Sequence, residues 1–318
     1  DPDRMAAVMG MAVQSLDVVV ETYDDLVAKG PDRVNPFSVA KYAPNAVVQH
    51  ICIELGIKGR SMMISTGCSS SSNAIGNSYE MIRNGLYDVV AAGGVETPVI
   101  PVLFASFCAM RSLSKRNQEP VKASSPFDKK RDGYVLSEGA AVLIVEEMEH
   151  ALKRNAHIYA EITGYACTSD AFSMFEVNPD EGPAAKAMIN SLKAAGLRSS
   201  DVDYLNAHGS SSLVSDAKET RAIKQTFNGH CEKVQVSSLK SMIGHPLGAA
   251  GALQCAASLM AINENIILPT INYEEPDPAC DLDYVPNEAR FYRVNVAMVN
   301  SFGIGGNNTS LVLQKFLN

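Results

Sequence analysis

Strand-like and helical segments alternate along almost the whole of this 318-residue chain. Apolar and β-branched runs, which are typical of buried strands, occur at 61–66, 89–96, 140–147, 157–166, 202–207, 234–238 and 296–302. Amphipathic helical patterns lie between several of these runs, for example at 183–196 and 249–264. A chain with this pattern covers its strands with helices, so the alternation predicts an α/β layered protein.

The composition excludes several classes of protein. The net charge is −8 and basic runs are short, which argues against a nucleic-acid-binding protein. No uninterrupted run of 18 apolar residues is present, so no membrane span is predicted. The seven cysteines form no C-x-x-C pair and no tight cluster. This argues against a zinc site or a disulfide framework and predicts reduced thiols in a cytoplasmic protein.

Two of the strand–helix units share one design. In the first, the strand at 61–66 leads through a tight turn to Cys68 and then to a helix of small residues. In the second, the strand at 234–238 leads to Gly244 and His245, followed by another small-residue helix at 249–261. An internal duplication that delivers one catalytic element from each half explains this pattern, and so does chance similarity within an α/β protein.

Cys68 stands in the turn of the first unit, within the sequence STGCSSSS. A side chain on a sharp turn between a strand and a helix is held rigid and exposed, as in the nucleophile elbow of hydrolases. The helix N-terminus is expected to lower the pKa of the thiol, and its free N–H groups can hold the oxyanion of an attacked thioester. The alternative is a small buried structural cysteine followed by an N-cap region.

Two of the six histidines occupy comparable positions. His208 follows the strand at 202–207, and His245 lies between glycines just ahead of a helix. Loops at strand ends often carry function, although a single histidine there is more often structural. Lys240 and Glu219 are candidate partners of each other, either as a buried pair that positions the histidines or as a surface salt bridge of little energetic worth.

The glycine-rich segment NSFGIGGNNTSLVL, at 300–313, predicts a flexible loop entering a final strand. Its spacing is not G-x-G-x-x-G and no helix follows it, so a nucleotide-binding loop is a weak interpretation.

Six blocks of the sequence resemble the β-ketoacyl-acyl carrier protein synthases of the thiolase-like superfamily, most of all the FabF-type elongating ketosynthases and the type II polyketide ketosynthases. In the family's order they are STGCSSS, SSPFDKKRDGYVLSEGAAVLIVEE, NAHGSSSLVSDAKET, VSSLKSMIGHPLGAAGA, INYEEPDPACDLDYVPNEAR and NSFGIGGNN. The resemblance implies a thiolase-like α/β fold of two duplicated βαβαβ-type halves, in α-β-α-β-α layers. The N-terminal half would span 1–150 and the C-terminal half 151–318.

The resemblance also implies that the N-terminal part of the first half is missing. The family normally opens with a strand and helices before the point where this chain begins. The segment DPDRMAAVMGMAV resembles a second or third strand. We therefore expect a central strand to be absent and strand edges to be unpaired, unless another segment fills the gap.

Residue roles follow from the resemblance. Cys68 in the first half would be the nucleophile that takes an acyl group from a carrier protein. In the second half, His208 and His245 would be the catalytic histidines, supported by Lys240 and Glu219. The oxyanion and gating position would combine the backbone N–H groups of Cys68 and Ile304, and the substrate-binding residues would be Val13, Ser210, Ser212, Phe302, Gly305 and Gly306.

The implied reaction is a decarboxylative Claisen condensation. An acyl group held on Cys68 would be attacked by the enolate that malonyl carrier protein forms on losing carbon dioxide, and a 3-ketoacyl product would leave. The substrates arrive on the phosphopantetheine of an acyl carrier protein, and no metal or redox cofactor is required. The family also implies a dimer, either a homodimer or a heterodimer with a related ketosynthase-like subunit.

Some positions depart from the family pattern. Ile304 replaces the usual phenylalanine, Val13 the usual isoleucine of the acyl pocket, and Asn307 the usual threonine. These changes imply an acyl pocket of altered shape. The pathway therefore stays open between fatty acid synthesis and a type II polyketide synthase in which this chain pairs with a chain-length factor.

A basic patch is expected for carrier-protein docking, because carrier proteins are typically acidic and this chain is acidic too. Lys129, Lys130 and Arg131 are the candidates, and a solvated turn is the alternative.

Three rival functions are weaker. A thiolase would need a second cysteine in the C-terminal glycine loop, which here reads SFGIGG. A non-catalytic chain-length factor would lack the nucleophile. A cysteine hydrolase would need one histidine oriented by an asparagine or aspartate, rather than two histidines and a lysine.

Overall fold

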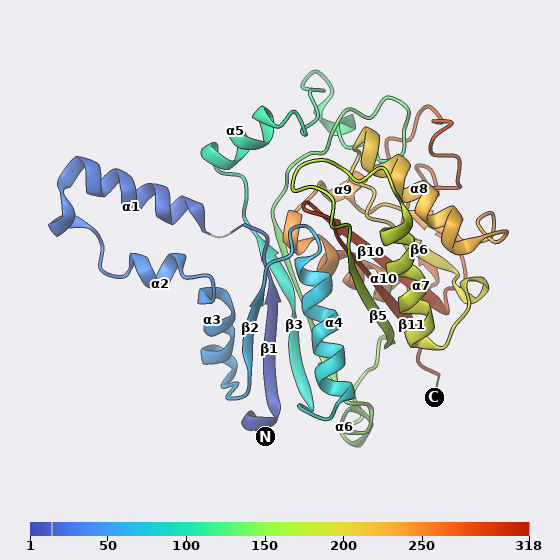
Figure 1. Cartoon of the computed structure of the whole chain (residues 1–318). Coiled ribbons are helices and arrows are strands. Elements are labelled where there is room, and N and C mark those ends of the chain that lie inside the picture. Colours follow the sequence, from blue (N-terminus) through green and yellow to red (C-terminus); the bar gives the residue numbers. More distant parts are fainter. Residues whose placement is uncertain (14, 318) are drawn as a thin grey trace.

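The computed structural model describes residues 1–13 and 15–317 and contains two main β-sheets (Figure 1). The first sheet has the strand order β2-β1-β3-β4 and consists of β1 (Met5–Gly10), β2 (Ser61–Ile64), β3 (Val89–Glu96) and β4 (Gly139–Glu146). The second has the order β5-β11-β10-β6-β7 and consists of β5 (Glu161–Ser169), β6 (Tyr204–Asn206), β7 (Gln235–Ser237), β10 (Val296–Gly303) and β11 (Asn307–Gln314). A small third sheet pairs β8 (Ile266–Ile267) with β9 (Arg290–Phe291).

Helices separate and cover the two sheets. Between the sheets lie α4 (Ser70–Arg83), which contacts strands of both, and α10 (Ala250–Glu264), which contacts β4 and β10. The outer face of the first sheet is covered by α3 (Ala46–Leu55), and that of the second by α7 (Gly182–Ala195) and α8 (Leu213–Phe227). These five layers confirm the expected α-β-α-β-α arrangement (Figure 1).

The residues of β1 explain why this sheet is covered on both faces. Ala6 and Val8 pack into the core between the sheets, whereas Ala7 and Met9 pack against α3. Side chains alternate between the faces of a strand, so a strand buried on both faces reads as a continuous apolar run. The remaining short helices are α2 (Ser38–Tyr42), α5 (Pro101–Ala109), α6 (Met148–Lys153) and α9 (Lys240–Ile243).

The two sheets share one topology. In the first, β2, β1 and β3 are parallel and β4 is antiparallel to β3; in the second, β7, β6 and β10 are parallel and β11 is antiparallel to β10. The second sheet carries one more strand, β5, which pairs antiparallel with β11. Within the described residues nothing pairs with the corresponding outer edge of β4.

This comparison corrects the expectation that a central strand is absent. The counterpart of β5 would lie at the edge of the first sheet, beside β4, and not at its centre. The centre is complete, because Ala7 of β1 pairs with Ser61 of β2 on one side and with Ala91 of β3 on the other. The edge of β4 that faces away from β3 has no strand partner in the part of the chain described here.

Small residues allow α4 to lie tightly between the sheets. Ser69, Ser70, Ser71 and Ser72 are all fully buried at its start, and the Ser72 hydroxyl lies 2.7 Å from that of Ser301 in β10. A Cβ added at Gly76 would lie 2.2 Å from the ring of Tyr165 in β5. The serine run is therefore a close-packing surface of the middle layer.

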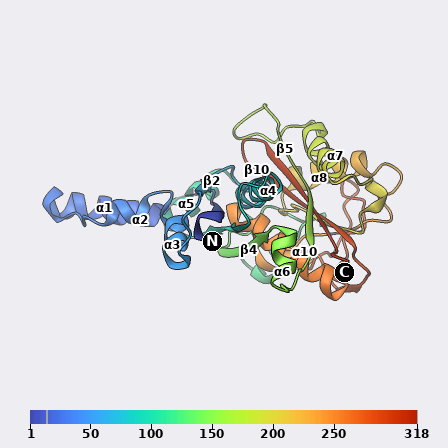
Figure 2. The ribbon, with the colours of Figure 1, turned by 90° about the horizontal axis from the view of Figure 1, so that it is seen from below.

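The segment from α1 (Leu16–Lys29) to α2 projects away from the layered body (Figures 1 and 2). It carries exposed apolar side chains that touch no core: Val19, Val20, Tyr23, Leu26, Val27, Phe37 and Val39. Across residues 1–13 and 15–317, we find no helix with the length and apolarity required to span a membrane.

Candidate active site

The structure brings the predicted residues from both halves of the chain to one pocket of about 280 Å³. Cys68 reaches it from the turn between β2 and α4, whereas His208 follows β6 and His245 follows α9. Their neighbours in the pocket wall include other predicted residues: Val13, Ser210, Ser212, Phe302, Ile304, Gly305 and Gly306. The corresponding ends of the two related sheets thus each supply part of one site.

The two imidazole rings lie edge to face at this pocket. The ring centroids of His208 and His245 are 5.3 Å apart and the planes are inclined by 84°. The ring of Phe302 lies 5.8 Å from that of His208, and the ring of Tyr134 lies 5.3 Å from that of His245. Burial lowers the pKa of both histidines well below the ordinary value, and the nearby Lys240 charge lowers each further. Both rings are therefore neutral at physiological pH.

Lys240 and Glu219 lie behind the histidines rather than in the pocket wall. The Lys240 ammonium donates to the backbone carbonyl of His208 at 2.7 Å and to Oε1 of Gln254 at 3.0 Å. The Glu219 carboxylate accepts from the backbone N–H of His208 at 2.8 Å and of Gly209 at 2.7 Å. The two side chains make no direct ion pair within the described residues.

The surface salt bridge considered for Lys240 and Glu219 is wrong, because both side chains are buried. Burial raises the pKa of Glu219 and lowers that of Lys240. Each side chain forms a hydrogen bond with the backbone of His208 and not with the other side chain. The turn after β6 is therefore held by charge-assisted hydrogen bonds.

Cys68 differs from expectation in its acidity. Burial raises the pKa of the Cys68 thiol to about 11, while the backbone N–H of Ile304 and the charge of Lys240 oppose that rise. This direction is opposite to the expected lowering by the helix N-terminus, because burial of the thiol outweighs the N–H groups ahead of α4, which begins at Ser70. The resting nucleophile candidate is therefore a thiol.

The loop from Gly303 to Gly306 closes over Cys68. The Ile304 N–H opposes the rise in the pKa of Cys68, and a Cβ added at Gly67 would lie 3.3 Å from the Ile304 carbonyl oxygen. Gly305 and Gly306 have φ values of 81° and 83°, which side chains other than glycine rarely adopt. The Ile304 side chain is 45% exposed, so it stands at the mouth of the pocket.

Sequence reasoning missed two buried polar side chains that hold the site. Glu96, at the end of β3, accepts from the backbone N–H groups of Ala12, Val13 and Gly248 at 2.7, 3.0 and 2.9 Å. It thus ties the predicted acyl-pocket residue Val13 to the loop after His245. A charged residue at the end of an otherwise apolar strand is the signal that could have found it.

Gln254 of α10 is the second missed residue. Its amide donates to the Ala207 carbonyl oxygen at 2.8 Å and to the Asn300 carbonyl oxygen at 3.2 Å, while its Oε1 accepts from Lys240. No local pattern marks it, because its partners come from three distant segments.

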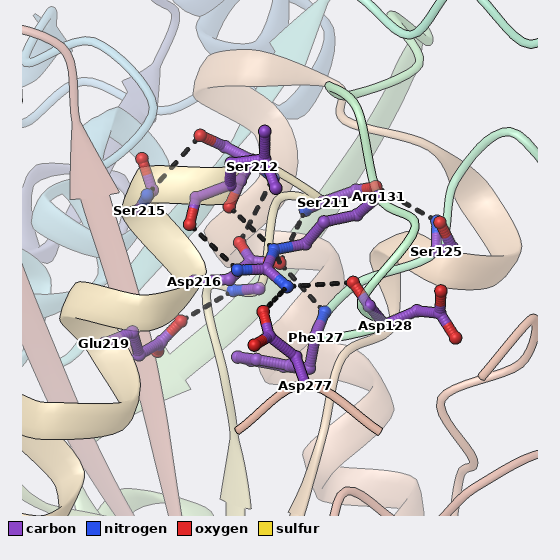
Figure 3. A network of polar contacts seen from close by, with 12 residues as sticks. Ser125, Phe127, Asp128, Arg131, Ser211, Ser212, Ser215, Asp216, Glu219 and Asp277 are labelled. Atoms are coloured by element: carbon purple, nitrogen blue, oxygen red, sulfur yellow. Dashed lines mark hydrogen bonds and ion pairs between the residues drawn. The ribbon is translucent and has the colours of Figure 1, made fainter. Parts of the chain in front are cut away.

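Arg131 cannot serve as the predicted docking residue. Its side chain is buried, and Figure 3 shows its guanidinium inside a network of backbone carbonyls and carboxylates. Lys129 and Lys130 are exposed, and both pair with Glu275. The docking hypothesis is wrong for Arg131 and stays a prediction for the two lysines.

All seven cysteines are free, and Cys68 is the only one of them that lines the pocket. Cys280, the other cysteine weighed for a thiolase, is fully buried in the core beneath the second sheet. In the described ranges, no group of three or more His, Cys, Asp or Glu side chains is arranged to hold a metal ion.

Comparison with known proteins agrees with this geometry. The beta-ketoacyl synthase N-terminal domain matches residues 1–151 and the beta-ketoacyl synthase C-terminal domain matches residues 159–274. A 3-oxoacyl-[acyl-carrier-protein] synthase 2 of Coxiella burnetii is 45% identical over 98% of this chain and 75% of its own length. That of Synechocystis is 43% identical over 99% of this chain and 76% of its own.

Solved structures share the fold. A ketosynthase in complex with its type II polyketide acyl carrier protein and bound to the hexaketide superposes with a TM-score of 0.96 at 34% identity, over 99% of this chain and 79% of that one. A beta-ketoacyl synthase from Burkholderia phymatum gives 0.92 at 37% identity, over 99% and 76%. The ishigamide ketosynthase/chain length factor gives 0.90 at 30%, over 99% and 76%. With both family domains matched and relatives this similar along nearly its whole length, the chain belongs to the β-ketoacyl synthase family.

Proposed function

We propose that this chain is a β-ketoacyl-acyl carrier protein synthase. It joins an acyl group carried on Cys68 to a two-carbon unit derived from malonyl carrier protein. One observation carries the proposal: Cys68, His208 and His245 line the same pocket, and both histidines are neutral. A thiol with two neutral N–H donors suits thioester transfer followed by formation of an enolate.

In the first step, the Cys68 sulfur attacks the carbonyl carbon of an acyl thioester on the phosphopantetheine arm. The C–S bond to the arm breaks, and the proton of the Cys68 thiol passes to the departing sulfur. The N–H groups of Ile304 and Cys68, which oppose the rise in the pKa of the thiol, hold the oxyanion. Because burial keeps the resting residue a thiol, attack requires the proton to move as the C–S bond forms.

In the second step, malonyl carrier protein loses carbon dioxide. The electrons of the broken C–C bond form an enolate, whose oxygen accepts hydrogen bonds from His208 and His245. Neutral imidazoles donate without a fixed positive charge that would trap the carboxylate of the substrate. The enolate carbon then attacks the acyl-Cys68 thioester, 3-ketoacyl carrier protein leaves, and a proton from solvent restores the thiol.

Two rival activities lack support in this geometry. A thiolase would need a second cysteine at the site, whereas Cys68 is the only cysteine among the described residues that line the pocket. A cysteine hydrolase would need an asparagine or aspartate on its histidine, yet Nδ1 of His208 and Nδ1 of His245 are both buried without a hydrogen-bond partner in the described chain.

A type II polyketide pathway is the second candidate for the same reaction. The polyketide ketosynthase with its carrier protein, and the ishigamide ketosynthase/chain length factor, favour it by their structural similarity. The curated relatives named 3-oxoacyl-[acyl-carrier-protein] synthase 2 favour fatty acid synthesis. Product analysis distinguishes the two pathways. A fatty acid enzyme adds one two-carbon unit to a chain that is reduced before the next addition. A polyketide enzyme with its partner subunit extends an unreduced poly-β-keto chain repeatedly.

The partners of the reaction are an acyl carrier protein and a second ketosynthase-like subunit. Charge reversal at Lys129 and Lys130 should raise the KM for carrier-bound substrate and leave the KM for a pantetheine thioester unaffected. Equal effects on both substrates would reject docking there.

The exposed apolar arm of α1 and α2 supports a dimer, because monomeric proteins rarely expose such a surface. Light scattering of the pure chain, alone and with a partner subunit, separates homodimer from heterodimer.

The direct test is acylation of Cys68. Incubation with acyl carrier proteins of several chain lengths should leave an acyl adduct on the Cys68 peptide, detected by mass. Cys68→Ala should lack the adduct, while Cys231→Ala, which changes a cysteine outside the pocket, should keep it. A folded protein that takes no acyl group of any length would refute the proposal.

A further inference from the structure

Arg131 is the centre of a buried polar network next to the pocket (Figure 3). Its side chain is 1% exposed. The guanidinium donates to the carbonyl oxygens of Ser212 at 3.1 Å, Leu213 at 2.8 Å and Asp128 at 2.8 Å, and to the Asp277 carboxylate at 2.5 Å. It therefore links the loop after His208 to two other segments.

Asp216 completes the network from the opposite side. Its carboxylate lies 3.6 Å from Nε of Arg131. It accepts from the backbone N–H groups of Phe127 at 2.9 Å, Ser211 at 3.1 Å and Ser212 at 3.3 Å. Arg131 thus binds carbonyl groups, and Asp216 binds N–H groups, of the same two segments, 125–131 and 209–213.

The loop that they hold needs external support. Gly209 and Ser211 have φ values of 34° and 71°, and Phe127 on the facing segment has 65°. Residues with side chains seldom adopt this region unless the surrounding structure imposes it. A Cβ added at Gly209 would lie 2.6 Å from Cβ of Ser238, so the loop is also packed without spare room.

This loop carries the two hydroxyl residues predicted to meet the substrate arm. Ser210 and Ser212 both line the pocket, and His208 lies immediately before them. Arg131 itself is not among the residues that line the pocket. Its hydrogen bonds to the carbonyl oxygens of Ser212 and Leu213 nevertheless fix the path of the backbone that does. We propose that Arg131 is a positioning residue that sets the Ser210 and Ser212 hydroxyls for binding the pantetheine arm of the thioester substrate.

The inference rests on the proposed function and deepens it. A purely structural role for the network would lower stability and every activity together. A positioning role should instead separate substrates that carry the pantetheine arm from those that do not. The short alkyl thioester S-ethyl butanethioate has no arm, and butyryl-pantetheine has one, so the pair isolates the contact.

The test uses Arg131→Lys in the full chain. Lysine keeps the charge but cannot donate in the same fork to Ser212, Leu213 and Asp277. We expect the KM for acylation of Cys68 by butyryl-pantetheine to rise roughly tenfold, the effect of losing one or two hydrogen bonds. Acylation by S-ethyl butanethioate and alkylation by iodoacetamide should change by less than about twofold.

A double-mutant comparison makes the test specific. Ser210→Ala/Ser212→Ala should raise the same KM on its own. Adding Arg131→Lys to this double variant should have little further effect, because both changes remove the same interaction with the pantetheine arm. Additive effects, or an equal loss with both thioesters, would overturn the inference. If Arg131→Lys does not fold, Asp277→Ala, which removes only the outer acceptor of Arg131, is expected to give the same substrate-selective change, and an unchanged KM there would overturn the inference.

Failure of the inference and failure of the proposed function are distinguishable. If the wild-type chain is not acylated by either thioester, the proposed function fails. If the wild-type chain is acylated and Arg131→Lys treats both thioesters alike, only the positioning role fails.

Discussion

Glu219 and Lys240 hold the same residue by opposite ends of its backbone. The carboxylate of Glu219 accepts the N–H of His208, and the ammonium of Lys240 donates to the His208 carbonyl oxygen. Neither side chain touches the imidazole by a hydrogen bond in the described residues, so both act through the peptide that carries it. The ring of His208 is thus set by two buried charges that do not pair directly with each other.

Replacing Glu219 by glutamine should damage both stability and decarboxylation. An amide oxygen can accept one of the two N–H groups, but the NH₂ group would meet the other N–H donor. Leaving a buried donor unsatisfied costs about 1–3 kcal/mol. Urea unfolding should show that loss, and decarboxylation of malonyl carrier protein should fall with it. Glu181→Gln, at a half-exposed ion pair with Arg221, is the control and should change neither stability nor decarboxylation. Unaltered decarboxylation in Glu219→Gln would contradict a role of Glu219 in positioning His208.

Replacing Lys240 by methionine should raise the pKa of both histidines. The Lys240 charge lowers the pKa of His208 and of His245, so its removal makes the imidazolium form of each less unfavourable. Burial remains and keeps both values below normal. A histidine NMR titration of the variant and the wild type measures the change. Lys233→Met, at an exposed position outside the pocket, provides the baseline. Unchanged titration of both histidines would show that their pKa does not depend on Lys240.

The raised pKa of Cys68 predicts a specific pH dependence of its reactivity. With a pKa of about 11, the thiolate fraction and hence the rate of iodoacetamide alkylation should keep rising from pH 6 to pH 9, by about tenfold per pH unit. The rate is measured as modification of the Cys68 peptide, with Cys68→Ala defining the background. A plateau near pH 7 would mean that the site stabilises the thiolate, as the sequence alone led us to expect.

Close packing of the middle layer predicts a stability effect away from the pocket. In Gly76→Ala the new methyl group would lie 2.2 Å from the Tyr165 ring, so that ring, α4 or β5 must move. Overpacking of this kind costs about 1–3 kcal/mol in free energy of unfolding. Glu80→Ala, on the exposed side of the same helix, should not lose stability. Equal stability of the two variants in urea unfolding would show that the two sheets can separate without cost.

Local patterns allowed much of this protein to be predicted. The α/β layering follows from periodicity, which depends only on how a helix and a strand direct neighbouring side chains. Cys68 and His208 follow strand ends, and all three residues including His245 stand next to a glycine in the sequence. All three line one pocket, as expected. The roles assigned to them stay predictions until acylation is measured.

Other features depended on contacts between segments far apart in the chain. Arg131 stands in a basic run and resembles a surface residue, yet it is buried because segments 81 to 146 positions away supply most of its partners. For the acidity of Cys68, the structure points in the opposite direction to the sequence, because desolvation depends on what packs over the thiol. The position of the unpaired strand edge at β4 emerged only from the order of the strands. The sequence by itself determined which local elements form and which chemical groups they carry, whereas the tertiary structure alone decided burial and partners, since both depend on three-dimensional packing.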